Sequence, residues 1–143
     1  MEKDSVDPEI KADVVATLDS DNGYINVALV GQKDEYGVEY ATTGSFIIRR
    51  GCSKDNYADW NTVLKFKLMG QRPSRWLWKD YTIEPGYSYK YCLQQYNDSG
   101  LMSNRLESNE VYAFFEDIFL YDGKRQLKIK YNPKISSFKT NIM

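Results

Sequence analysis

The stretch of sequence that decides the fold is residues 79–96, KDYTIEPGYSYKYCLQQY. At its centre Glu84-Pro85-Gly86 predicts a tight turn, because proline presets φ and glycine accepts the left-handed region. We expect a short strand before this turn, at residues 79–83, and a long strand after it, at residues 87–96. One face of the long strand carries Tyr87, Tyr89, Tyr91 and Leu93. Because tyrosine favours strands over helices, the stretch is typical of a β protein.

Working outward, short strands separated by turn signals recur along the chain. Further strands are expected at residues 12–18, 24–30, 44–50 and 60–68, and an irregular edge strand at 101–112. The Asn22-Gly23 pair is a strong hairpin signal between the first two of them. No segment shows a sustained helical period, and about seven strands fit between residues 12 and 112. The sequence therefore predicts an all-β antiparallel sandwich.

The chain is expected to divide into three parts. Residues 1–13 are polar and acidic and predict an N-terminal linker or arm, and residues 14–111 form the sandwich. Residues 112–143 predict a β-hairpin extension or the start of a second domain. Their turn is Asp122-Gly123, and residues 126–131 alternate apolar and basic side chains.

The composition of the 143 residues argues against catalysis. There is no histidine, which excludes triads that need a histidine base and metal sites built on imidazole. The two cysteines cannot by themselves build a zinc site or an iron–sulfur cluster. No apolar run approaches the roughly 18 residues of a membrane helix. We therefore expect no enzyme activity, no cofactor, no bound metal and no membrane span.

Charge is unevenly distributed along the chain. Residues 1–43 hold 3 Lys and 10 Asp or Glu, a net charge of −7, whereas residues 44–143 carry a net charge of +6. The acidic part of one subunit could contact the basic part of a neighbouring subunit. The alternative is a solvated surface whose lysines protect an exposed strand edge. Nucleic-acid binding is not expected, because the basic C-terminal end carries too few aromatic side chains for a stacking platform.

The run at residues 80–91 resembles the E-to-F corner of a fibronectin type III domain. The residues that match this tyrosine corner are Ile83, Pro85, Gly86 and Tyr89. The resemblance covers residues 14–110 and implies an immunoglobulin-like sandwich in which the Tyr89 hydroxyl bonds to a nearby backbone group. One departure is that the family's strand B tryptophan is absent, since Leu29 or Val30 stands there. Trp60, Trp76 and Trp78 could fill the core from other strands.

Residues 114–139 resemble a stretch that follows a fibronectin-like domain in structural proteins of tailed bacteriophages. The resemblance implies a virion component of the tail, baseplate or neck, made in the host cytoplasm. Its partners would be other virion proteins and copies of itself, as a homo-oligomer. In those proteins the chain usually continues further, so we expect a longer polypeptide beyond Met143.

Two groups of residues are candidates for the assembly interface. They are the basic residues of the predicted hairpin, Lys124, Arg125, Lys128 and Lys130, and the tryptophans Trp76 and Trp78. The tryptophans, with Tyr81, Arg72 and Arg75 nearby, could equally belong to the core, contact a neighbouring subunit or stack on a glycan. The alternative function is therefore a fibronectin-like accessory or carbohydrate-binding module of a cell-surface or secreted protein.

Cys52 and Cys92 fall on neighbouring strands of the resembled fold. In a reducing cytoplasm we expect free thiols packed as small apolar groups. A cross-strand disulfide is the alternative, although the geometry of adjacent strands rarely suits one.

Overall fold

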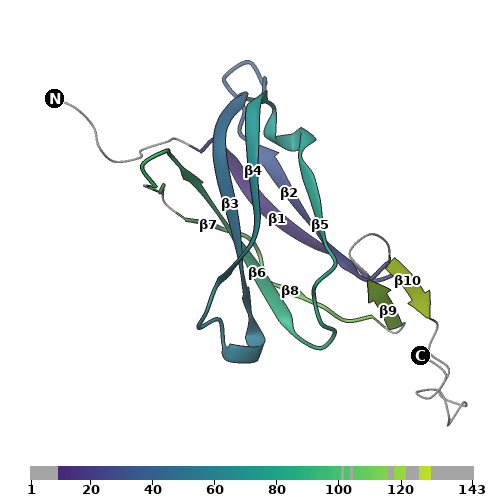
Figure 1. The fold of residues 1–143 in the computed structure, drawn as a ribbon. Coiled ribbons are helices and arrows are strands. Elements are labelled where there is room, and N and C mark those ends of the chain that lie inside the picture. Colours follow the sequence, from purple (N-terminus) through teal and green to yellow (C-terminus); the bar gives the residue numbers. More distant parts are fainter. Residues whose placement is uncertain (1–9, 101, 104, 116–117, 122–125, 130–143) are drawn as a thin grey trace, which may run out of the picture.

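The computed structural model describes residues 10–100, 102–103 and 105–115, together with the backbone of 118–121 and 126–129 (Figure 1). Its strands are β1 (Ala12–Asp19), β2 (Tyr24–Gly31), β3 (Thr42–Cys52), β4 (Asn61–Gln71), β5 (Leu77–Asp80), β6 (Ser88–Tyr96), β7 (Leu106–Glu107), β8 (Val111–Tyr112), β9 (Ile118–Tyr121) and β10 (Gln126–Ile129). Two short 3-10 turns, η1 (Ser53–Asp55) and η2 (Pro73–Arg75), lie between strands.

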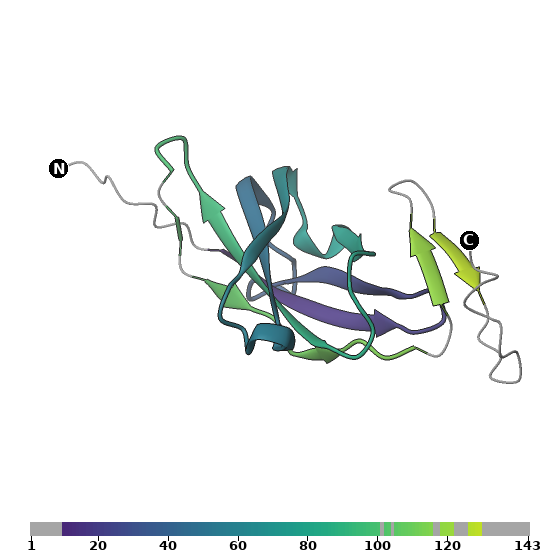
Figure 2. The same ribbon diagram turned by 60° about the horizontal axis from the view of Figure 1, so that its bottom comes forward.

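These strands form two antiparallel sheets and a separate hairpin. One sheet has the order β1-β2-β5, and the other has the order β4-β3-β6-β7 with β8 also paired to β6. Figure 2 shows the two sheets as stacked layers, with the β9–β10 hairpin beside them. The predicted all-β, fibronectin type III-like sandwich is confirmed.

The core lies between the sheets and is built by alternation along the strands. In β2 the side chains of Ile25, Val27 and Leu29 are buried, as the period of two predicts. The facing sheet contributes the buried side chains Phe46, Ile48, Leu68, Tyr89, Tyr91 and Leu93. Trp76 and Trp78 are half-buried and pack against this cluster. Of the two residues Leu29 and Val30, only Leu29 is buried in the core.

Strands β3 and β4 run further than expected. The predicted connection at residues 69–78 contains the end of β4, the turn η2 and the start of β5. The β3–β4 register shifts between Thr42 and Thr43, and this irregularity lets the pairing continue past Gly70, whose φ is +73°.

The expected last strand is broken into two short pieces. Between β7 and β8, Ser108 faces Tyr91 and uses its side chain as a strand partner: Tyr91 N–H donates to Ser108 Oγ at 2.9 Å. The next residue, Asn109, turns toward the other sheet. The core continues into the following segment, where Ala113 is fully buried.

Candidate interaction surfaces

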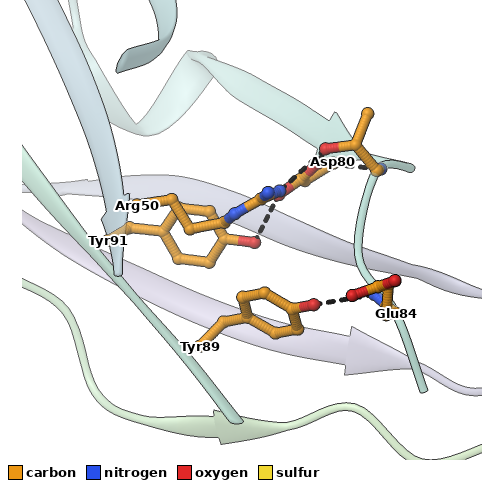
Figure 3. Close-up of polar contacts among 6 residues, drawn as sticks. Arg50, Asp80, Glu84, Tyr89 and Tyr91 are labelled. Atoms are coloured by element: carbon orange, nitrogen blue, oxygen red, sulfur yellow. Dashed lines mark hydrogen bonds and ion pairs between the residues drawn. The ribbon is translucent and has the colours of Figure 1, made fainter. Parts of the chain in front are cut away.

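The tyrosine corner holds the turn between β5 and β6. Glu84 N–H donates a hydrogen bond of 2.7 Å to the Tyr89 hydroxyl, which is drawn in Figure 3. Gly86, at φ +95°, donates its N–H to the carbonyl of Ala113 at 2.7 Å. Ile83 is buried beneath the turn. Burial raises the pKa of Tyr89 to about 12, although the bond from Glu84 opposes this shift.

A buried carboxylate, Asp80, joins strands of both sheets (Figure 3). Its Oδ2 accepts hydrogen bonds from Arg50 Nη1 and from the Tyr91 hydroxyl, both at 2.7 Å. Its Oδ1 accepts from the N–H and the hydroxyl of Thr82 at 3.0 and 2.7 Å. Asp80 is 0% exposed and both oxygens are satisfied, so this centre is structural. No local sequence pattern links Arg50 to Asp80, and the centre was not predicted.

The charges around Asp80 set the ionisation of its neighbours. Burial alone would lower the pKa of Arg50, but the charge and hydrogen bond of Asp80 outweigh burial and raise it. The pKa of Tyr91 is raised by burial and then by the charge of Asp80. A cationic Arg50 and a neutral Tyr91 therefore persist across the neutral pH range.

The predicted aromatic cluster at residues 76–81 separates into three contacts. Trp76 stacks on Phe66 with ring centroids 4.3 Å apart, and Trp78 meets Tyr91 edge-on at 6.4 Å. Tyr81 meets Tyr24 edge-on at 5.1 Å. These contacts favour a core position for the two tryptophans over a contact with a neighbouring subunit or a glycan-stacking site.

A pocket of about 310 Å³ lies where β4 ends, lined by Ala41, Gly70, Gln71, Arg72 and Arg75. Its wall is fixed by Glu39, whose carboxylate accepts hydrogen bonds from Ser74 N–H at 2.7 Å and Ser74 Oγ at 2.6 Å. These bonds from Ser74 are the main reason that the pKa of Glu39 is lowered. Both arginines are exposed, and within the described ranges neither guanidinium forms an ion pair. The pocket is therefore cationic and open.

The outer face of the larger sheet carries a basic and aromatic cluster that was not predicted from the sequence. Arg105 lies 4.8 Å from the Trp60 ring, and Lys90 lies 4.8 Å from the Tyr57 ring. The Trp60 ring covers Gly51 so closely that a Cβ there would lie 2.7 Å from it. These residues are far apart in sequence, and no local pattern indicates that they meet.

The basic residues of the predicted hairpin are only partly described. Lys128 lies on β10 opposite Phe119 on β9, and this pairing is known from the backbone. Lys124, Arg125 and Lys130 lie outside the described residues. Their role in assembly stays a prediction.

Both cysteines are free thiols in the structure. Cys92 is buried, and Arg105 Nη2 lies 3.4 Å from its sulfur. Cys52 Sγ accepts from Lys54 N–H at 3.4 Å, at the start of η1. The structure therefore agrees with the expected free thiols and contains no disulfide between Cys52 and Cys92.

Among the described residues, no three His, Cys, Asp or Glu side chains are placed to share a metal ion. Nor does the described part contain a helix that is long and apolar enough to cross a membrane.

No protein-family model and no curated protein sequence matches the chain. Among solved structures, titin kinase with its flanking domains is similar over 78% of this chain and 18% of its own length, at 14% identity and a TM-score of 0.49. Pectate lyase Pel3 from Pectobacterium carotovorum is similar over 70% of this chain and 25% of its own, at 12% identity and a TM-score of 0.42. An Fn3-like protein from Clostridium thermocellum is similar over 67% of this chain and 85% of its own, at 14% identity and a TM-score of 0.40.

The chain thus spans less than a third of the first two of these proteins. All three TM-scores lie below 0.5, and the fold class rests on the strand order of the chain itself.

Proposed function

We propose that the protein is a non-enzymatic structural component of a bacteriophage virion, in the tail, baseplate or neck. The observation that carries this proposal is the resemblance of residues 114–139, directly after the sandwich, to structural proteins of tailed phages. The β9–β10 pairing within this segment is compatible with the hairpin that the turn and alternation signals of residues 112–143 predict.

Assembly would use the sandwich as a rigid spacer that presents the basic hairpin to neighbouring subunits. Asp80 and the tyrosine corner tie β3, β5 and β6 together, so the spacer keeps its shape. The acidic first third of one subunit would attract the basic end of the next, which sets orientation and register. Repetition of one such contact around a closed ring is a common way for subunits to assemble.

The first experiment is the mass of the protein in solution, by size-exclusion chromatography with light scattering at low and high salt. We expect a defined oligomer that dissociates at high salt, because charge pairs at a surface are screened. A monomer under all conditions would contradict self-assembly of the isolated chain.

A charge-reversal variant tests which surface is used. Replacing Lys124, Arg125, Lys128 and Lys130 by glutamate should abolish the oligomer and leave the circular dichroism spectrum unchanged. A control that reverses Lys33, Lys54 and Lys79 on the sandwich should still assemble. An oligomer that survives the hairpin variant would rule out the proposed surface.

The virion role itself is tested on particles. Mass spectrometry of purified particles from the phage that encodes the chain should find the protein in a fixed copy number. Immunogold labelling should then place it on the tail, baseplate or neck. Absence from the particles would refute the proposal.

The alternative, a glycan-binding accessory module, needs exposed aromatic faces. Trp76 and Trp78 pack against Phe66 and Tyr91, which leaves them poorly placed to stack on a sugar. We therefore favour assembly.

A further inference from the structure

Strand β4 offers the longest free edge of the sandwich. It lies at the end of its sheet and, among the described strands, pairs only with β3. The other edges are short or occupied: β5 has four residues, β7 and β8 have two each, and the edge of β1 is bonded to Asn109 at Ala16. An unpaired row of backbone N–H and C=O groups is a template for a further strand.

The free edge is regular along the part that a partner would need. From Leu64 to Met69 the pairing with β3 runs without interruption, and the register shifts lie outside this segment. Six residues of strand span roughly 20 Å. Leu64, Phe66 and Leu68 face inward along it, whereas Lys65 and Lys67 are exposed.

Within residues 61–75 the charges have one sign, while the Glu39 carboxylate lies beside them, hydrogen-bonded to Ser74. Residues 61–75 include Lys65, Lys67, Arg72 and Arg75, and no aspartate or glutamate. The two arginines line the pocket at the end of β4, so the cationic row continues from the strand into a cavity of about 310 Å³. Edge and pocket together form one surface, which we call the β4 surface (residues 64–72 and Arg75).

We propose that the β4 surface binds an extended acidic peptide segment of a partner protein by strand addition. The segment pairs its backbone with Leu64–Met69, its outward carboxylates lie beside Lys65 and Lys67, and one further carboxylate enters the arginine pocket. Cross-strand pairs of opposite charge stabilise such pairing, and arginine binds carboxylates through two parallel hydrogen bonds. The inference deepens the proposed assembly function and rests on it for its biological setting.

The same charges argue against the simplest other occupant, the β4 strand of a second copy. Pairing two β4 edges would bring the lysines of both strands together, and like charges on paired strands are destabilising. Lysines on an edge strand are a common protection against such self-pairing. The surface is therefore selective for an acidic partner strand.

The test uses the full chain and a synthetic nine-residue peptide in which glutamate and valine alternate. Its binding is followed by fluorescence anisotropy and by amide chemical shifts. We expect saturable binding, with the largest shifts at residues 64–75. No saturable binding at about 1 mM peptide, or shifts confined to other strands, would overturn the proposal.

Charge recognition is tested on both sides of the contact. A peptide with glutamine in place of glutamate, and the protein variants Lys65→Glu/Lys67→Glu and Arg72→Glu/Arg75→Glu, should each bind at least about tenfold more weakly. The control Lys54→Glu/Lys79→Glu should bind like the unaltered protein, because these lysines lie on η1 and β5. Equal losses in the control and the test variants would refute a defined site.

Strand addition is separated from simple charge attraction by N-methylation of the peptide. Methyl groups on one alternate set of backbone nitrogens should abolish binding, whereas methyl groups on the other set should leave it intact, because only one set faces β4. Binding that is indifferent to both sets would refute strand addition. These experiments use isolated molecules, so their failure leaves the particle tests of the virion role unaffected.

Discussion

At the scale of single residues, the stability of the sandwich depends on buried polar groups that are fully paired. Asp80 accepts bonds from β3, from β6 and from its own turn, and each donor would be costly to leave unpaired in the core. The same holds for the Tyr89 hydroxyl, which Glu84 N–H satisfies. Removing one partner should therefore cost more than replacing the whole group by apolar side chains.

Asp80→Ala should destabilise the protein by about 3–5 kcal/mol, because it leaves the Arg50 charge partly buried without its counterion. Tyr91→Phe should cost less, about 1–3 kcal/mol, since it removes one hydrogen bond of the centre. The measurement is urea unfolding at neutral pH. The double variant Arg50→Met/Asp80→Leu serves as control and should be more stable than Asp80→Ala. The reverse order would contradict a structural role for the charge pair.

Alkaline pH should weaken the fold through Tyr89. The pKa of Tyr89 is raised from 10.0 to about 12 in the folded protein, so the unfolded chain loses this proton first as the pH rises. The contribution to stability is complete below pH 10 and is lost between about pH 10 and 12, with a size of order 2 kcal/mol. Urea unfolding across this range should show a smaller loss for Tyr89→Phe than for the unaltered protein. The exposed Tyr112 provides the control, and Tyr112→Phe should follow the unaltered protein.

At the scale of elements, a side chain from the segment between β7 and β8 pairs with the edge of β1 in the other sheet. Ala16 on β1 donates its N–H to Asn109 Oδ1 at 2.9 Å, and Asn109 Nδ2 donates to the Ala16 carbonyl at 2.8 Å. The carboxamide thus reproduces the two bonds of a neighbouring strand. It covers the free edge of β1 at the place where the break between β7 and β8 turns the chain.

Asn109→Ala should cost about 1–3 kcal/mol and increase hydrogen exchange at the Ala16 amide. Exchange at Val27, on the partner strand β2, should change only with global stability. The control is Ser99→Ala in the exposed turn after β6, which should alter neither quantity. Unchanged exchange at Ala16 would show that Asn109 does not close the edge in solution.

Most strands were predictable because alternation and turn residues are local signals. Ile25, Val27 and Leu29 face the core where the pattern placed them, and the turn at Pro85-Gly86 lies between β5 and β6. The break at Ser108 and Asn109 was not predictable, since it depends on Tyr91 and Ala16 at distant positions. The candidate sites follow the same rule. The tryptophans could be named from sequence, but the pocket at Arg72 and Arg75 involves η2, which the distant residue Glu39 contacts through Ser74.

At the scale of the whole molecule, the strands of the hairpin form a sheet separate from the two sheets of the sandwich. β9 pairs with β10, and neither joins the two sheets of the described chain. The buried core extends from Ala12 to Ala113, and Phe115 packs against it. Residues 10–115 should therefore contain what the sandwich needs to fold.

A variant that ends after residue 115 should keep its thermal midpoint within about 3 °C of the full chain, because the buried core stays intact. A variant that ends after residue 105 loses Ser108, Val111 and Ala113 from the core and edge, and it should not fold. Differential scanning calorimetry measures both. A large drop for the longer variant would mean that the hairpin segment belongs to the sandwich.

The bond between Asn109 and Ala16 also bears on mechanical load. Ala16 lies on β1 and Asn109 lies between β7 and β8, so tension applied at the two ends of the sandwich would load the hydrogen bonds between them. The contact between Asn109 and Ala16 consists of two hydrogen bonds, whereas β1 and β2 are paired over eight residue pairs. A stretched molecule would release β1 from Asn109 before the ladder to β2 unzips, and the first step of mechanical unfolding would depend on one side chain.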